Sequence, residues 1–348
     1  MGLSQPRQSY FSSGKVRVSA KLADILFVVR NDFKMKINKL GNTGIMVSRM
    51  CFGSLTIGPL QKNKTLSESR EIIAAALDCG VNFFDTADLY NNYDHLRAAI
   101  QIKKDVVIAT KSYDYTATGV RKSLSRALSE LGRDYVDLYL LHEQESQKTI
   151  AGHWEAIEAL MVEKQAGKVR AIGISTHRVE GVYGANLFPE LDVIHPLINL
   201  TGIGIEDGTA EEMTAAIHQA KKLGKGIYAM KPLGGGNLLS RKQASFEYVL
   251  NLTDLDAIAI GVQSVNEVLY NVKKFNGETI SVDLEAAVSH ASKSLHISDW
   301  CTGCGECVKR CKQRALALVG GKAQVDQKKC VLCCYCSPAC KDFCIKVI

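Results

Sequence analysis

The last 48 residues of this 348-residue chain contain ten of its twelve cysteines, and eight of the ten form one spacing written twice. The spacing is C-x2-C-x2-C-x3-C, which gives two runs: Cys301, Cys304, Cys307 and Cys311, and then Cys330, Cys333, Cys336 and Cys340. In such a run a tight loop offers three thiolates to one iron-sulfur cube, while the fourth cysteine ligates the other cube. The repeat therefore predicts two 4Fe-4S clusters with crossed ligation, in which Cys311 and Cys340 each ligate the cluster of the other run.

Structural zinc and a disulfide scaffold are the alternatives for such dense cysteine. Zinc sites favour paired C-x2-C hooks separated by a longer loop, whereas each run here continues into a third and a fourth cysteine. The other 300 residues hold only Cys51 and Cys79, and we recognise no secretory signal, which argues against disulfides. The stretch resembles a bacterial two-cluster ferredoxin, a small α+β domain. We interpret Cys334 and Cys344 as non-ligands.

The charge and hydropathy of the sequence limit the classes of partner that the chain is expected to bind. The formal charge of +7 counts every cysteine as neutral. Eight thiolates on two oxidised cubes of core charge about +2 add roughly −4, which leaves about +3 and removes the support for nucleic-acid binding. No apolar run approaches the roughly 18 residues that a membrane span needs, so we expect no membrane contact. Clusters of this type survive best in a reducing interior, so we expect a cytoplasmic protein.

Short apolar runs alternate with amphipathic stretches from Met50 to about Phe275. Eight runs are predicted to be buried parallel strands: residues 50–55, 81–87, 105–111, 135–142, 169–175, 191–200, 226–233 and 257–262. The clearest helix covers Thr118–Leu131, and Gly132 follows it as a stop signal. Eight strand–helix units predict an α/β fold, the (β/α)8 TIM barrel. A doubly wound open sheet is the competing architecture, but FGSLTIG after the first strand lacks its glycine fingerprint.

The predicted organisation has four segments. Residues 1–34 form an N-terminal extension, which we favour as an accessory or wrongly started leader because Met35 opens a sequence that reads as a complete domain. The barrel covers 35–281, and a helical linker over 282–300 includes a helix at Leu284–Leu295. The ferredoxin-like domain covers 301–348.

Four ionisable residues lie at the ends of three consecutive predicted strands: Asp85, Tyr90, Lys111 and His142. Chemistry in such barrels sits at the carboxyl ends of the strands, so we expect the four side chains to converge. In FFDTADLY, VVIATK and DLYLLH they resemble the catalytic tetrad of the aldo-keto reductase superfamily. KLGNTG, GISTHR, PLGGG and GVQSVNEV also look like that family. The resemblance covers about residues 36–275, and with the tail it matches the iron-sulfur branch of the family.

The resemblance implies an oxidoreductase that reduces a small-molecule carbonyl substrate with NADP or NAD. Tyr90 would donate the proton, Lys111 would lower the pKa of Tyr90, Asp85 would hold Lys111, and His142 would orient the carbonyl oxygen. The resemblance also implies ten cofactor-binding residues. These are Ser175, Thr176 and Asn199 at the nicotinamide, Leu233, Gly234 and Gly235 at the pyrophosphate, and Gln263, Ser264, Glu267 and Asn271 at the adenosine half.

The two kinds of redox group carry electrons differently, because nicotinamide moves a hydride and a 4Fe-4S cluster moves one electron. Two functions therefore stay open: a reductase whose clusters transfer electrons, and an electron-transfer or scaffold protein with structural clusters and a non-catalytic barrel. Basic residues crowd the cysteine loops, and they predict an acidic one-electron carrier, a flavodoxin or another ferredoxin. The alternative is a solvated basic face that balances the anionic clusters.

Overall fold

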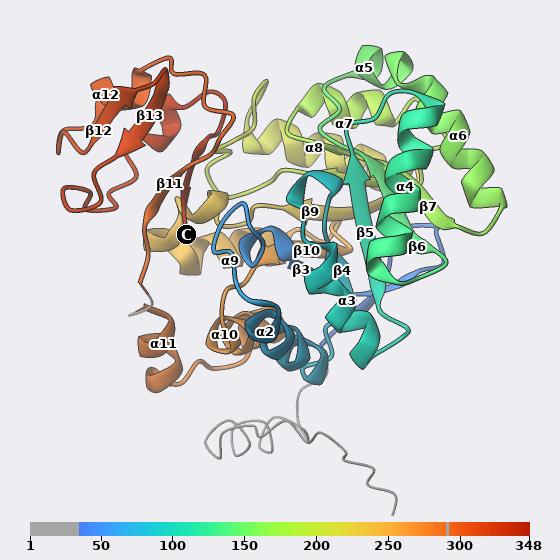
Figure 1. The fold of residues 1–348 in the computed structure, drawn as a ribbon, viewed down its shortest axis with the longest axis horizontal. Coiled ribbons are helices and arrows are strands. Elements are labelled where there is room, and N and C mark those ends of the chain that lie inside the picture. The colour runs from blue at the N-terminus through green and yellow to red at the C-terminus, as the bar shows by residue number, and fades with distance from the viewer. Residues whose placement is uncertain (1–34, 290–291) are drawn as a thin grey trace, which may run out of the picture.

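Eight parallel strands close into a barrel at the centre of the molecule (Figure 1). The computed structural model describes residues 35–289 and 292–348, so the expectation for residues 1–34 lies outside the described residues. The barrel strands are β3 (Met50–Gly53), β4 (Phe83–Asp85), β5 (Val107–Ser112), β6 (Val136–Leu141), β7 (Val169–Thr176), β8 (Val193–Pro196), β9 (Gly226–Met230) and β10 (Ala257–Gly261). Strand β10 pairs with β3 and closes the ring. The predicted (β/α)8 barrel is confirmed, and each predicted apolar run overlaps one strand.

Helices cover the outside of the barrel, which explains why the strands read as continuous apolar runs. They are α2 (Leu66–Asp78), α3 (Tyr93–Ile102), α4 (Ala117–Leu131), α5 (Gln147–Gly152), α6 (Trp154–Gln165), α7 (Val179–Ala185), α8 (Ala210–Lys222), α9 (Lys242–Asn251) and α10 (Val265–Asn276). Helix α4 begins one residue before its predicted start, with the Thr116 side chain accepting from the backbone of Gly119. It ends at Gly132, which has the left-handed φ of 67° that favours glycine at a helix C-terminus. No helix of the described residues combines the length and hydropathy that a membrane crossing requires.

A hairpin closes the amino end of the barrel. Its strands β1 (Ile37–Lys39) and β2 (Met46–Ser48) pair antiparallel. Leu40 and Val47 from this hairpin are fully buried and join Phe83 from the barrel interior in one apolar cluster. The open end of the barrel is therefore the carboxyl end of its strands, where active sites of this architecture lie.

The segment after the barrel differs from the predicted helical linker over 282–300. Helix α11 (Val282–Ser289) is helical as expected, but Leu295–Ile297 form strand β11 rather than the end of a helix. Strand β11 pairs antiparallel with β14 (Ile345–Val347) at the far end of the sequence. The prediction of helix up to residue 295 is wrong because this partner strand is not visible in the local pattern.

The C-terminal part is a small α+β arrangement that lies beside the barrel (Figure 1). Helix α12 (Glu306–Arg310) precedes a hairpin of β12 (Leu316–Val319) and β13 (Lys322–Val325). Strand β14 then packs against a short 3-10 turn of the barrel, η3 (Gly234–Gly236). The last strand of the chain therefore lies at the open end of the barrel.

Candidate active site

A buried ion pair lies at the carboxyl ends of β4 and β5. The Lys111 ammonium donates to both oxygens of Asp85 and to the Thr86 carbonyl oxygen, each at 2.8 Å. Lys111 and Asp85 are 1% and 5% exposed. Three acceptors satisfy the three N–H groups of the ammonium, which is the condition under which a charge is tolerated in an apolar interior.

Tyr90 lies next to this pair, at the end of the 3-10 turn η2 (Asp88–Tyr90). Its ring centroid is 4.9 Å from the Lys111 nitrogen and 6.0 Å from the centroid of the His142 ring. Burial raises the pKa of Tyr90 well above its ordinary value, and the negative charges of Asp85 and Glu143 raise it further. The expected lowering of this pKa by Lys111 is therefore wrong, because the ammonium is bound to Asp85 and desolvation of the phenolate dominates.

His142 follows β6 and stacks on Tyr113, with ring centroids 4.4 Å apart. Burial lowers the pKa of His142 well below its ordinary value, and the charge of Lys111 lowers it further. The imidazole is therefore neutral at neutral pH. Within the described part of the chain, its buried Nδ1 atom has no hydrogen-bond partner.

Two further residues of this cluster, Tyr228 and His195, were not predicted from the sequence. The Tyr228 hydroxyl donates to Asp85 Oδ1 at 3.1 Å, and the His195 ring stacks on the Tyr228 ring at 3.9 Å. Burial lowers the pKa of His195 to about 4. Tyr228 lies inside the apolar run GIYAM and carries no strand-end signal, whereas His195 interrupts a buried run and could have been noticed.

The main cavity has a volume of about 480 Å³, and Asp85 and Tyr90 are among the residues that line it. Among the ten predicted cofactor-binding residues, five border it: Leu233, Gly235, Gln263, Glu267 and Asn271. The loop of PLGGG is unusual in its backbone, since Gly235 and Gly236 have φ values of +63° and +87°. Side chains rarely adopt this conformation, so the glycines keep the cavity wall free of side chains here.

The other five predicted cofactor residues do not border this cavity: Ser175, Thr176, Asn199, Gly234 and Ser264. Ser175 accepts a hydrogen bond from the Glu143 backbone, and the Asn199 side chain is hydrogen bonded to the backbone of Ile203. Ser264 caps α10. In this structure these side chains hold the loops at the strand ends.

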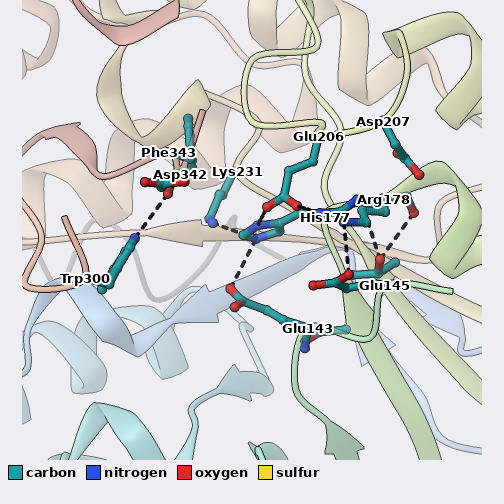
Figure 2. Close-up of polar contacts among 12 residues, drawn as sticks. Glu143, Glu145, His177, Arg178, Glu206, Asp207, Lys231, Trp300, Asp342 and Phe343 are labelled. Atoms are coloured by element: carbon teal, nitrogen blue, oxygen red, sulfur yellow. Dashed lines mark hydrogen bonds and ion pairs between the residues drawn. The ribbon is translucent and has the colours of Figure 1, made fainter. Parts of the chain in front are cut away.

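A charged network around His177, which the sequence did not predict, lies just after the ends of β6, β7 and β9 (Figure 2). His177 is 2.8 Å from the Lys231 nitrogen and lies 3.6 and 3.7 Å from carboxylate oxygens of Glu143 and Glu206. The Phe343 ring from the C-terminal part covers this network, with its centroid 4.8 Å from the Lys231 nitrogen. The barrel mouth and the segment after Cys340 therefore share one set of contacts.

The two cysteine runs surround two separate cavities. One is lined by Cys301, Cys304 and Cys307 together with Cys340, which is the crossed set of the first predicted cluster. The other is lined by the remaining four predicted ligands, Cys330, Cys333, Cys336 and Cys311. Within residues 35–289 and 292–348, no three His, Cys, Asp or Glu side chains are grouped to hold a single metal ion.

Superposing one cysteine run on the other shows which positions the two extra cysteines, Cys334 and Cys344, occupy. The two runs are related by a shift of 29 residues, from Cys301 to Cys330, and this shift places Cys334 on Gly305 and Cys344 on Ala315. Cys334 and Gly305 share a left-handed backbone, with φ values of 60° and 78°. The Ala315 and Cys344 amides each donate to the sulfur of the last cysteine of their run, at 3.4 and 3.2 Å. The extra cysteines thus occupy positions that are not cysteine in the first run, although both also line the cavities.

Comparisons with known proteins cover the barrel. The profile of the Aldo/keto reductase family matches residues 49–281. A 6-dehydroglucose reductase of Novosphingobium aromaticivorans is 30% identical over 248 residues, which are 64% of this chain and 77% of that protein. An L-galactose dehydrogenase of Arabidopsis thaliana is 27% identical over 301 residues, which are 72% of this chain and 92% of that protein.

Solved structures agree with this match. A crystal structure from Pseudomonas aeruginosa, described as that of an aldo-keto reductase, has a TM-score of 0.62 and 27% identity, and the match covers 71% of this chain and 96% of that one. An aldo-keto reductase from Bacillus halodurans, at 22% identity and a TM-score of 0.60, shares the fold. The family match ends before the first cysteine run.

Proposed function

Because the chain belongs to the aldo/keto reductase family and is an oxidoreductase, we propose that it reduces a small-molecule carbonyl with NADP or NAD. The observation that carries the proposal is the buried pair of Lys111 and Asp85 within reach of the Tyr90 ring, with Asp85 and Tyr90 on the wall of the main cavity. The names of the two sugar-active relatives support a carbohydrate carbonyl as the substrate class.

In this proposal Tyr90 is the proton donor to the carbonyl oxygen. Burial and the charge of Asp85 raise its pKa, so the phenol keeps its proton at neutral pH until the developing alkoxide accepts it. Lys111 pairs with Asp85 beside the ring, so that the carboxylate charge there is balanced. His142 is neutral and donates a hydrogen bond that orients the carbonyl oxygen.

The cavity volume of about 480 Å³ lies within the range usual for small-molecule and cofactor sites. A nicotinamide cofactor supplies a hydride when bound. Met230 lines the cavity, the left-handed glycines Gly235 and Gly236 form a part of its wall without side chains, and Gln263 and Asn271 offer amide groups. Glycine at such positions lets a backbone approach phosphate closely.

We further propose that the C-terminal part holds two 4Fe-4S clusters with the crossed ligation. Support comes from the two cavities, each lined by three cysteines of one run and the fourth of the other. Backbone amides already donate to three of the sulfurs, those of Cys301, Cys311 and Cys340, and amide donors of this kind tune a bound cluster. Bound clusters would store and pass single electrons.

We propose that an external acidic carrier, of the flavodoxin or ferredoxin type, exchanges electrons with these clusters. The basic residues around the cysteine loops support this proposal, and Lys309 and Lys329 are more than half exposed. Both also form ion pairs with neighbouring acids, Glu306 and Asp326, so part of the positive charge is balanced locally.

The reductase proposal is tested by steady-state reduction of aldoses and simple aldehydes with NADPH and NADH. Tyr90→Phe should lower kcat by about 10²-fold or more, since it removes only the proton donor. Tyr115→Phe is the matched control, because Tyr115 is 63% exposed and packs on His153 away from the tetrad. Equal activity in the Tyr90 variant would contradict the proposal and favour an electron-transfer or scaffold protein with a non-catalytic barrel.

The cluster proposal is tested on anaerobically purified protein by iron analysis and absorbance. About eight irons per chain are expected from two cubes. Zinc, or iron near four, would contradict the proposed clusters. If NADPH or NADH alone bleached the cluster absorbance within one turnover, without a flavin, the external carrier would be unnecessary.

A further inference from the structure

The C-terminal strand covers the glycine turn of the barrel. A Cβ atom added to Gly236 would lie 2.0 Å from the Val347 carbonyl oxygen, so the two backbones are in direct contact. The buried Asn237 side chain donates to the carbonyl oxygens of Gly234 at 2.8 Å and of Ile345 at 3.0 Å. The turn that we assign to the cofactor diphosphate is therefore held in place by β14, which lies outside the matched family region.

One side chain of β14 enters the main cavity. Lys346 is 5% exposed, lines the cavity, and its Cδ atom lies 2.7 Å from the position of a Cβ atom on Gly235. Its ammonium donates to the Phe343 carbonyl oxygen and faces the Phe343 ring. The side chain thus extends across the glycine turn. Burial lowers the pKa of Lys346 well below its ordinary value and the charge of Lys231 lowers it further, so an anion bound here would favour the charged form.

A second lysine, which is half-buried, lines the same cavity. Lys231 precedes the turn, has a left-handed φ of 58°, and hydrogen bonds to His177. Burial lowers the pKa of Lys231 to about 8, whereas the charges of Glu143 and Glu206 raise it. Among the described residues, neither Lys231 nor Lys346 has a carboxylate within the 4.0 Å of an ion pair.

Two lysines at the glycine turn without a close carboxylate favour the binding of an anion, because an unpaired positive charge away from water is costly. Asp85 and Tyr90 of the tetrad line the cavity together with Gln263 and Asn271, and both lysines line it near the glycine turn. A dinucleotide places its doubly negative diphosphate in its middle, between the nicotinamide and the adenosine. Two lysines at the glycine turn match the two negative charges of the diphosphate in number.

We propose that Lys346, together with Lys231, binds the diphosphate of the dinucleotide, so that the C-terminal strand completes a cofactor site which the barrel alone leaves open. This inference rests on the proposed function. It adds a cofactor ligand from the C-terminal part and links the cofactor to the segment that carries Cys340. An anionic group on the carbonyl substrate is the competing occupant.

Equilibrium binding tests the proposal on full-length, anaerobically prepared protein of verified iron content. Dissociation constants are measured by calorimetry for NADPH, NADH, ADP-ribose and adenosine. Lys346→Met removes the charge and keeps the length of the side chain, and Lys346→Arg keeps the charge. Lys328→Met is the matched control, because Lys328 is exposed in the loop before the second cysteine run.

Lys346→Met should weaken NADPH, NADH and ADP-ribose by about 10- to 100-fold, the range for losing one charged hydrogen bond. Adenosine should bind as before, Lys346→Arg should retain most of the affinity, and Lys328→Met should match the wild type. Lys231→Met should show the same pattern and serves as the second variant if Lys346→Met loses iron.

The remaining outcomes distinguish a failure of this inference from a failure of the proposed function. If the wild type binds dinucleotides and neither methionine variant binds them more weakly, the inference is wrong and the proposed function stands. If only the KM for the carbonyl substrate rises, the lysines serve the substrate and the inference is again wrong. If the wild type binds no dinucleotide, the proposed function fails together with it.

Discussion

Replacing Lys111 by methionine removes the positive half of the buried pair and leaves the negative half in place. Among the side chains that the structure describes, Asp85, at 5% exposure, would keep only the Tyr228 hydroxyl at 3.1 Å as a hydrogen-bond donor. Thr86 would also lose a partner for its carbonyl oxygen. Removing one member of a buried pair costs about 3–5 kcal/mol of unfolding free energy. We expect about 3 kcal/mol, because the Tyr228 hydroxyl still donates.

The measurement is urea unfolding followed by circular dichroism at neutral pH under anaerobic conditions. Lys103→Met is the control, because its pair with Asp105 is long, at 4.0 Å, and exposed, and should contribute less than about 1 kcal/mol. Adding Asp85→Asn to Lys111→Met should recover part of the loss, since the unpaired charge is then gone. The reasoning is refuted if Lys111→Met costs no more than Lys103→Met, or if the double variant is less stable than the single one.

Three further predictions concern acid, the junction and the extra cysteines. The pKa of His195 is about 4 in the folded chain and about 6.5 in the unfolded chain, so its contribution to stability is present above pH 6.5 and is lost as pH falls toward 4. Urea unfolding at pH 5 should therefore show a loss of about 2 kcal/mol in unfolding free energy relative to neutral pH, and the loss should be smaller in His195→Gln. Asn237→Ala should cost about 1–3 kcal/mol and speed hydrogen exchange in residues 342–348, whereas unchanged exchange would contradict its role in holding β14. Cys334→Ser should keep about eight irons per chain and Cys333→Ser should not, so equal iron contents would overturn the ligand assignment.

The barrel could be predicted because its signal is local. A parallel strand covered on both faces must be apolar throughout, so runs such as Val136–Leu141 are visible without knowing their neighbours. Asp85 and Lys111 could be paired for a similar reason, since carboxyl ends of adjacent parallel strands meet at one rim.

Features that depend on distant partners could not be predicted. The sequence predicts helix up to Leu295, where the structure begins strand β11. Leu295–Ile297 form a strand because they pair with Ile345–Val347, which lie far away in the sequence. The pKa of Tyr90 was expected to fall, but its direction depends on how completely the phenol is desolvated and on which acceptors already bind the ammonium. The sequence does not predict Lys346 as a cofactor residue, because a lysine near the cysteine runs is expected to be exposed, whereas the fold buries it.

The contact between Gly236 and Val347 also affects how glycines in this family are interpreted. A glycine in a phosphate-binding turn is usually explained by the ligand, yet Gly236 is excluded from bearing a side chain by the backbone of β14. Relatives that lack the appended strand are free of this restriction, although the positive φ of 87° still favours a small residue. The third glycine of PLGGG is therefore a marker for a covering strand, and it can help to recognise, from their amino-acid sequences, other barrels that carry such an extension.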